Sequence, residues 1–517
     1  APARRRGPEA VLRRIAGRHS VDAVVNAVPA AADGLRTVLT AHPAATGLLR
    51  RPKLAAWADP AVLPRVLLRG RERALAPETT RTLLELLAMP ELGGLDDVER
   101  VCDPASLAEF GLALFEGWRA AGMPADHGWA LARLDRLADD TAVPVLAPLI
   151  RSWPGKDRMH SAKAALDVLV GIGTDTALTV VHDLAVRWPG VTLRKAAERA
   201  FARAAAARGV PAGVLGDRLV PDLGLDDDGA VTVDYGRRRF TVRFDARLRP
   251  VVTDEDGVLR KSLPKPGKRD DPRLAPAAHA AFAELRKKVA DAAAVQVTRL
   301  ENAMRTGRAW TPAQFRDYAV RDPLVRQIAR RLVWLAHDDG AATAFRIAED
   351  GTFADARDDV FTPSGAARIT VAHPVRLGAA AGTWAAILAD YELLQPFPQL
   401  DHPVWTLTDG ERAGSRLDRF AGREVRQDAV YGLLARDWIR VGDRGRIETI
   451  ARRVTDGGCI VAEFDPGEGG SGHFVIRCVR AATGPGRAGA PVPFGGLDPV
   501  AASEALADLV ATAEGTS

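Results

Sequence analysis

One short stretch of the sequence gathers three residue types that are used in hydrolytic chemistry. The segment "FDPGEGGSGHF" (464–474) places Asp465, Ser471 and His473 within nine residues. A serine nucleophile, a histidine base and an orienting aspartate normally come from separate elements that pack rigidly against one another. A glycine-rich loop does not hold such groups in place. We therefore interpret the segment as a connection between strands rather than as an active site.

A second stretch, "GPGRAG" (484–489), has the letter pattern of a dinucleotide-binding loop and follows a predicted strand. Such a loop must open a helix whose N-terminus holds the pyrophosphate. Here it is followed by "APVPFGG", which cannot form that helix. We expect a surface loop, and the sequence assigns no cofactor.

Metal-binding residues are also present, but without the spacing of a ligand set. His373 and His402 each precede a proline and, together with Asp401, would offer ligands of the right type. The ten histidines and three cysteines show no paired spacing typical of a zinc site. We expect hydrogen-bonded, structural histidines and no metal.

The stretch "YELLQPFPQL" (391–400) leaves two interpretations open. Its two prolines exclude both a helix and a central strand, and they predict a stiff, extended segment with Phe397 and the glutamines on opposite sides. In the first interpretation it is a strut: Phe397 fills the core and the glutamines bond loop backbone. In the second it is the wall of a groove for an anionic or peptide ligand. The candidate ligand-binding residues are then Gln395, Phe397, Gln399, Arg416, Arg419 and Arg423.

The helices and strands that would position these candidate residues must belong to more than one hydrophobic core. A chain of 517 residues exceeds the roughly 250–300 residues of a single core. We predict a helical N-terminal region (1–128), helical repeats (129–215) and a mixed α+β domain (216–517). With 47% hydrophobic and 26% charged residues, the composition is that of an ordinary globular protein.

The helical repeats rest on an internal similarity. "DDTAVPVLAPLIRSWPG" (139–155) aligns with "TDTALTVVHDLAVRWPG" (174–190), and the same offset of 35 residues relates Leu134 to Leu169 in the preceding apolar stretches. A period of this length is typical of stacked helical hairpins, which bury their apolar faces only against one another. We predict HEAT-like repeats, with "KAAERAFARAAAARG" as a third copy or a terminal cap.

The pattern changes near residue 216, where short alternating runs separated by Asp-Gly turns predict a small antiparallel sheet. A helix is expected over roughly 273–305, and further helices are expected to begin at Thr311-Pro312 and at Asp322-Pro323. A final strand pair is predicted around "GCIVAEFD" and "HFVIRCV". The predicted fold class is α+β, with an all-α region followed by the mixed domain.

Seven motifs, in this order, resemble a bacterial family known as domain of unknown function 4132. They are "LPKPGKRDD", "QVTRLENAM", "RLVW", "FRIAEDGTFAD", "AHPVRL", "ADYELLQPFPQL" and "RLDRFAGREV", within residues 263–425. The resemblance extends over about 220–512. That family includes proteins labelled molybdate metabolism regulators and many chains with a WGR module, which is not evident here. The resemblance implies helical repeats upstream of the domain, but no catalytic residues.

The net charge of +5 is small for 71 basic and 66 acidic residues that are spread along the chain. This argues against a nucleic-acid partner but leaves that class open, with the basic N-terminus as its contact. Three isolated cysteines fit a reducing cytoplasm, and neither export nor a membrane span is predicted.

Our leading hypothesis is a non-catalytic cytoplasmic interaction or regulatory protein in which the helical repeats dock a protein partner. The alternative is an enzyme or small-molecule sensor that binds a nucleotide or another anion in the C-terminal domain. The sequence leaves open whether that domain is catalytic, because active-site residues converge from distant positions.

Overall fold

The computed structural model of the chain describes residues 52–89, 95–245, 247–338, 340–442, 447–454, 458–467, 472–486 and 489–514. The helical character expected upstream of residue 52 lies outside the described residues, as does Ser471. The chain divides into two compact units, Ala1–Val220 and Pro221–Ser517. The division falls just after the short helix α13 (Ala212–Arg218).

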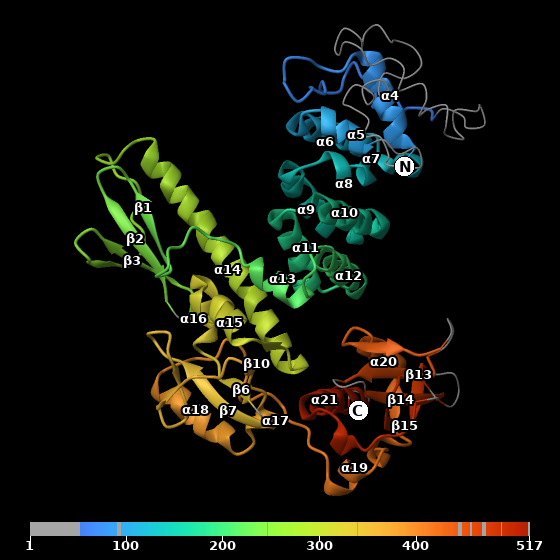
Figure 1. Ribbon diagram of the computed structural model, residues 1–517, viewed down its shortest axis with the longest axis vertical. Coiled ribbons are helices and arrows are strands. Elements are labelled where there is room, and N and C mark those ends of the chain that lie inside the picture. Colours follow the sequence, from blue (N-terminus) through green and yellow to red (C-terminus); the bar gives the residue numbers. More distant parts are fainter. Residues whose placement is uncertain are drawn as a thin grey trace, which may run out of the picture. The chain divides into compact units, whose positions relative to one another are not determined.

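The described part of the first unit is helical, and its helices form successive layers (Figure 1). One continuous cluster of buried apolar side chains runs through these layers from Ala58 to Leu219. Among the helices are α4 (Pro77–Ala88), α5 (Leu95–Val101), α6 (Pro104–Ala120), α7 (Trp129–Ala132), α8 (Leu134–Leu137), α9 (Val143–Ser152), α10 (Met159–Ile172), α11 (Asp175–Arg187) and α12 (Val191–Ala207).

The 35-residue period of the sequence has a counterpart in this packing. Leu134 and Leu169 are both fully buried, each in the first half of its copy. The first half of the earlier copy consists of two short helices, α7 and α8, whereas the later copy has the single helix α10. The stretch predicted as a third copy or a terminal cap forms α12, which is followed by the seven residues of α13.

Polar contacts between layers join residues about one period apart. Thr174 donates to Asp140, the Arg208 guanidinium bonds Asp175 at 3.0 Å, and Arg136 bonds Glu99 at 2.6 Å. These contacts span 34, 33 and 37 residues. Each layer is therefore bonded to its neighbours in the sequence, as in stacked repeat architectures.

The second unit contains three antiparallel sheets, whereas the sequence predicts one small sheet and a final strand pair. Their orders are β1-β2-β3-β4, β5-β10-β6-β7-β8-β9 and β11-β15-β14-β13-β12. The strands are β1 (Ala230–Asp234), β2 (Arg239–Phe244), β3 (Pro250–Asp254), β4 (Leu259–Arg260), β5 (Ala309–Trp310), β6 (Trp334–Asp338), β7 (Ala341–Ile347), β8 (Phe353–Ala354), β9 (Val360–Phe361), β10 (Arg368–Val371), β11 (Glu424–Arg426), β12 (Trp438–Arg440), β13 (Thr449–Arg453), β14 (Cys459–Pro466) and β15 (His473–Ala482). Strands β5, β8 and β9 of the additional sheet have only two residues each, which is too short for an alternating pattern to reveal.

The predicted mixed α+β character is confirmed. The helices and helical turns of the second unit include α14 (Leu274–Thr306), α15 (Pro312–Phe315), the π-helix η7 (Arg316–Arg321), α16 (Pro323–Ala329), α17 (Pro374–Leu377), α18 (Ala380–Asp390), α19 (Asp409–Ala413), α20 (Gln427–Leu433) and α21 (Pro499–Glu514). Helix α14 lies along the first sheet (Figure 1), where Phe282 packs with Phe240, Val242 and Val252.

The predicted helix starts follow their local chemistry. Thr311 and Gln314 form a capping box at α15, and the Asp322 carboxylate accepts the backbone N–H groups of Leu324 and Val325 at the start of α16. The predicted Asp-Gly turns also form, with positive φ at Gly229, Gly257 and Gly351.

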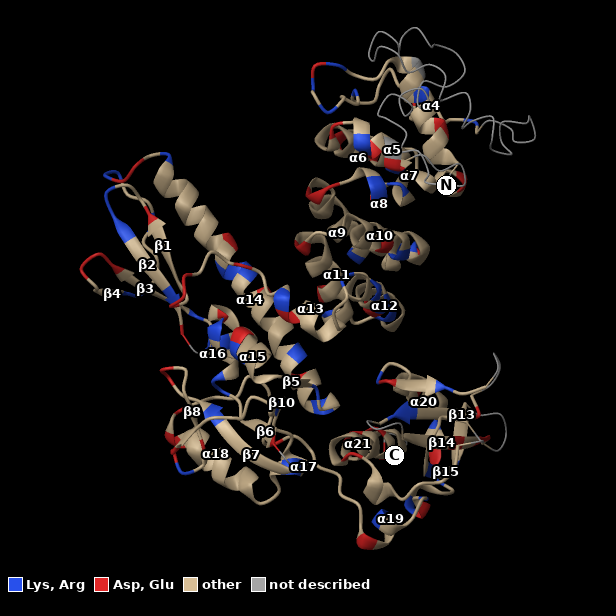
Figure 2. Ribbon diagram, viewed as in Figure 1, with Lys and Arg blue, Asp and Glu red and all other residues tan. Residues whose placement is uncertain are grey.

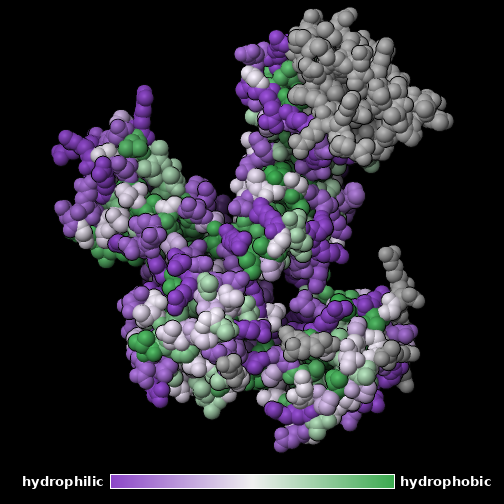
Figure 3. Space-filling model, viewed as in Figure 1, coloured by the Kyte–Doolittle hydropathy of each residue, from purple (hydrophilic) through white to green (hydrophobic). Residues whose placement is uncertain are grey.

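Basic and acidic residues are interspersed along the ribbon of each unit, as the even spread of charges in the sequence predicts (Figure 2). The face visible in Figure 3 is mostly hydrophilic, with apolar residues in separate patches. Among the described residues no helix has the length and apolar character that a membrane crossing requires.

The layer packing predicts an unusual effect of one glycine substitution. In a helix interior, Gly→Ala normally adds about 1 kcal/mol of stability. A Cβ at Gly171 in α10, however, would lie 2.7 Å from Asp135 Cβ and 2.9 Å from Asp135 O in α8. We expect Gly171→Ala to lower the free energy of unfolding by about 1–3 kcal/mol, measured by urea denaturation.

The control is Gly155→Ala, where a Cβ would meet no heavy atom within 4 Å. We expect this variant to unfold like the parent protein. A stabilising effect of Gly171→Ala would contradict the close approach of α8 and α10.

Candidate functional site

The stretch 391–400 is anchored in the core by the side chain of Gln399. Its Oε1 accepts the Val333 N–H at 2.9 Å, and its Nε2 donates to Val333 O at 2.7 Å and to Ala372 O at 2.8 Å. Val333 precedes β6 and Ala372 follows β10, so the amide extends the bonding between these strands. Gln399 is fully buried, and Phe397 is 7% exposed. These contacts are those of the strut interpretation.

The stretch is not extended throughout, contrary to the expectation from its two prolines. The Gln399 N–H donates to Phe397 O at 2.7 Å, which closes a three-residue turn centred on Pro398. A proline φ is compatible with such a turn. Both Phe397 and Gln399 are buried, so the expectation that they lie on opposite sides of the segment is wrong.

The three arginines predicted for the same site lie in another part of the second unit. Leu417 and Phe420, beside Arg416 and Arg419, belong to the core under the sheet β11–β15, whereas Leu393 and Leu400 pack on the core that includes Trp384.

Each of these arginines has a local contact. Arg416 Nε bonds Cys478 Sγ at 3.3 Å, Arg419 pairs with Glu411 at 3.2 Å, and Arg423 Nε donates to Arg419 O at 3.0 Å. Gln395 Oε1 accepts the Leu400 N–H at 3.2 Å. A shared ligand for the six predicted residues stays a prediction.

The structure brings the two predicted histidines together, but around Glu504 rather than Asp401. His402 Nε2 lies 2.5 Å and His373 Nε2 3.4 Å from Glu504 Oε1, and Arg305 binds Oε2. The side chains of Glu504 and His373 are each 1% exposed. Asp401 is exposed and lies outside this cluster.

Four separate segments supply this cluster. Arg305 comes from the end of α14, His373 caps α17, His402 follows the stretch 391–400, and Glu504 lies on α21. Burial raises the pKa of Glu504, but the hydrogen bonds from His373 and His402 and the charge of Arg305 outweigh it and hold the pKa below its usual range. A carboxylate buried in this way is stable only with such partners.

The donor set is of a type that binds Zn²⁺, because two imidazoles and a carboxylate come within 4.8 Å of one another. The protonation of His373 does not fit this role. Its Nδ1 accepts the Val375 N–H at 3.1 Å, so a neutral ring carries its proton on Nε2, which faces Glu504. A metal ligand needs the reverse arrangement, with a lone pair at the metal and an N–H on the outer nitrogen. The positive charge of Arg305 opposes a cation here as well.

A second buried carboxylate lies one turn further along α21. Asp508 is 2% exposed and accepts hydrogen bonds from Trp438 Nε1 at 3.0 Å, Arg452 at 2.8 Å and Arg436 at 3.2 Å. These donors belong to, or directly precede, strands β12 and β13. The two carboxylates thus bond α21 to α14 and α17 on one side and to the last sheet on the other.

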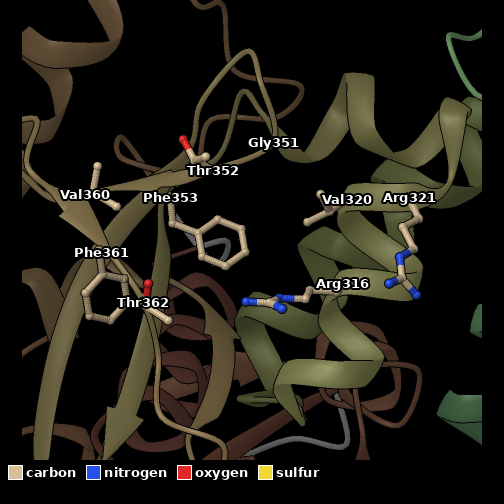
Figure 4. A pocket seen from close by; sticks show the side chains of 9 residues that line it. All are labelled: Arg316, Val320, Arg321, Gly351, Thr352, Phe353, Val360, Phe361 and Thr362. Atoms are coloured by element: carbon tan, nitrogen blue, oxygen red, sulfur yellow. The ribbon is translucent and has the colours of Figure 1, made fainter.

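A surface hollow near the π-helix η7 is separate from this network (Figure 4). Its volume is about 320 Å³. It is lined by Arg316, Val320, Arg321, Gly351, Thr352, Phe353, Val360, Phe361 and Thr362. In Figure 4 the Arg316 side chain of η7 points toward the apolar side chains of β8 and β9, whereas the Arg321 guanidinium points away from them.

The described residues of the remaining motifs lie on strands or in loops. Asp465 lies on β14 and pairs with Arg477 at 3.3 Å, while His473 begins β15, so "FDPGEGGSGHF" connects two paired strands. "GPGRAG" begins beyond β15 and is not followed by an α-helix until α21. The three cysteines are unpaired and buried.

The sequence analysis did not find Glu504, Arg305 or Arg316. One signal for Glu504 is its place in "PVAASEALADLV", where two acidic residues four positions apart lie in an apolar helix. Buried charges of this kind require partners, but the helix alone does not identify them.

Comparison with known proteins gives a family likeness for part of the chain. The model of the family described as Domain of unknown function (DUF4132) matches residues 257–438, which contain all seven motifs quoted above. The chain is 32% identical over 398 residues to a curated relative, "Uncharacterized protein YehI" of Escherichia coli (strain K12). This alignment covers 75% of the chain but 33% of the relative, so the chain spans about a third of that protein's length. No solved structure matches the chain.

We predict that Glu504→Gln destabilises the protein by about 1.5–3 kcal/mol at pH 7, because the buried carboxylate loses its charge-assisted bonds to Arg305, His373 and His402. Urea denaturation measures the loss. The matched control is Asp401→Asn, an acid-to-amide change at an exposed position. A difference of less than about 1 kcal/mol between the two variants would contradict the role of the network.

The comparison of the parent protein with Glu504→Gln also predicts a pH dependence of stability. Because the pKa of Glu504 is depressed in the folded state, its ionised form stabilises the protein above the ordinary value of 4.5, and this contribution is lost as the pH falls below that value. The Tm difference between the parent and Glu504→Gln should therefore shrink on acidification below pH 4.5. A difference that stays constant in this range would contradict the assignment.

The protonation of His373 predicts that metals do not stabilise the fold. A metal at 100 times its Kd would add roughly 2.7 kcal/mol and raise the Tm by several degrees. We expect neither excess Zn²⁺ nor chelation by EDTA to shift the Tm of the full chain, measured by scanning calorimetry. A rise with Zn²⁺ that disappears in His402→Ala would establish a metal site instead.

Proposed function

We propose that this chain is a non-catalytic interaction or regulatory protein whose helical unit docks a protein partner. The observation that supports this most is the layer structure of the first unit, with contacts between layers that span 33 to 37 residues. Stacked repeats of this kind form extended surfaces that bind other macromolecules. We further propose that the layers are HEAT-like repeats.

The chemistry of the second unit supports a non-catalytic role. The cluster that most resembles catalytic chemistry, Glu504 with His373 and His402, is bonded internally and to Arg305. A general base needs an available lone pair directed at a substrate. His373 uses its Nδ1 lone pair on backbone, and so it serves the fold.

The regulatory part of the proposal rests on the resemblance to proteins labelled molybdate metabolism regulators. That likeness concerns the second unit, which in this proposal responds to a signal while the first unit holds the partner. The compartment we propose is the cytoplasm, in keeping with three unpaired cysteines.

A second function, binding of an anionic small molecule by the second unit, is favoured by the hollow at η7. Arginine and apolar side chains line it together, as in sites that bind amphipathic anions. In this function the unit acts as a sensor.

Photo-crosslinking of the full chain in cells tests the docking function. A benzophenone amino acid is placed at two pairs of exposed positions one period apart: Thr141 with Thr176, and Lys156 with Val191. Because equivalent positions of stacked repeats share one surface, we expect both members of a pair to capture the same protein.

The control probe is Lys287, an exposed residue on α14 of the second unit. Adducts of the same mass from one pair, with none from Lys287, are the expected result. Adducts that appear equally from all five probes, or from none of them, would overturn docking by the layers.

A further inference from the structure

The hollow at η7 contains a cation without a protein partner. Arg316 is exposed and points across the hollow toward the side with Phe353, Phe361 and Thr362 (Figure 4). Within the described parts of the chain, its guanidinium makes no hydrogen bond or ion pair. Nearby Arg321 differs, because it pairs with Asp317 at 2.6 Å. Arg316 is thus the guanidinium that remains for a ligand.

The π-helix explains why residues of η7 converge here. Its turn holds about 4.4 residues, so positions i, i+4 and i+5 share one face. Arg316, Val320 and Arg321 have this spacing and all line the hollow. In an α-helix, position i+5 would be turned well away from position i. π-helical turns are energetically poor and occur frequently at functional sites.

The opposite wall is apolar and partly uncovered. Val360 on the edge strand β9 is 82% exposed, whereas Phe353 on β8 is 6% exposed. Val360 has the largest exposed fraction of the big apolar side chains that the structure describes. An apolar group of a ligand that packs against this wall would be removed from water, and so would the Val360 side chain.

The size and charge of the surroundings restrict the ligand. A volume of about 320 Å³ is at the lower limit for small-molecule pockets and favours a small ligand. A neighbouring hollow shares Val320, Arg321 and Gly351 and is also lined by Arg326 and by the more numerous carboxylates of Asp227, Glu349 and Asp350. These carboxylates disfavour a ligand with several negative charges.

We propose that the hollow binds a small organic carboxylate with a branched or aromatic tail. The carboxylate accepts the two parallel N–H groups of the Arg316 guanidinium, and the tail packs on Val360, Phe353 and Val320. This inference rests on the second proposed function and gives it a site and a ligand class. The β9 edge itself is short and is followed by Pro363, which makes an added peptide strand less favourable here.

Calorimetric titration of the full chain tests the inference with defined probes. The carboxylates are 3-phenylpropionate and isovalerate, and the neutral counterpart is 3-phenylpropanol. Acetate lacks the tail, and phenyl phosphate carries a second charge. We expect the two tailed carboxylates to bind more tightly than the other three compounds by roughly tenfold, because 3-phenylpropanol lacks the charge, acetate lacks the tail, and the second charge of phenyl phosphate lies near the carboxylates of the neighbouring hollow.

Substitutions test whether the probes bind in the hollow at η7. Arg316→Gln should weaken binding of 3-phenylpropionate by at least roughly tenfold, and Val360→Ser by several-fold, whereas Arg321→Gln should have a smaller effect because Arg321 is already paired. Arg286→Gln on the exposed face of α14 is the matched control and should not change binding. Both Arg316 and Arg286 are exposed, so their loss leaves the core intact.

The outcomes separate the two proposals. If a probe binds equally well to the parent and to Arg316→Gln, the second function survives and this site is overturned. If no probe binds the parent protein, both are overturned. Tighter binding of phenyl phosphate than of the carboxylates would overturn the proposed ligand class.

Discussion

The fold of the second unit depends on the hydrogen bonds and the ion pair that one buried carboxylate makes. Glu504 is 1% exposed, and its partners come from α14, α17 and the segment that follows residue 400. An isolated carboxylate at such a position would cost several kcal/mol, so these segments must meet at α21 for the unit to fold. Asp508 repeats the arrangement toward β12 and β13. Helix α21 lies close to the end of the sequence and therefore bonds to elements whose residues lie much earlier in the sequence.

This arrangement gives the two histidines, which the sequence offers as metal ligands, hydrogen-bond partners within the protein. His373 uses Nδ1 to cap α17 and Nε2 to bond Glu504, so its hydrogen-bonding capacity is already used. Arg316 presents the opposite case. It lies on a helix whose turn is widened, faces an apolar wall, and has no bonded partner among the described residues. Internally satisfied charges hold the fold, whereas a charge left for water or a ligand is a candidate for recognition.

The two units use different kinds of contact. In the first unit, the contacts between layers described above join residues 33 to 37 positions apart. In architectures of this kind each layer contacts only its neighbours, so a layer can be added without changing the contacts of the others. In the second unit, the contact of Arg305 with Glu504 spans 199 residues. A change in the second unit can therefore affect segments far apart in the sequence, which suits a ligand-responsive part. The first unit suits an extended docking surface.

The sequence by itself determined the features that depend on neighbouring residues. These include the capping box at Thr311, the Asp322 cap, the Asp-Gly turns, the 35-residue period and the mixed α+β class, because each is encoded within a few residues or one repeat. The turn at Pro398 was missed, since proline φ fits both an extended segment and a tight turn, and the bonds of Gln399 to Val333 and Ala372 accompany the tight turn. Only the tertiary structure brought Glu504 to His373 and His402 and left Arg316 facing β8 and β9. Those groups lie 131, 102 and about 40 residues apart in the chain, and no local pattern specifies which distant partner a buried or exposed charge will meet.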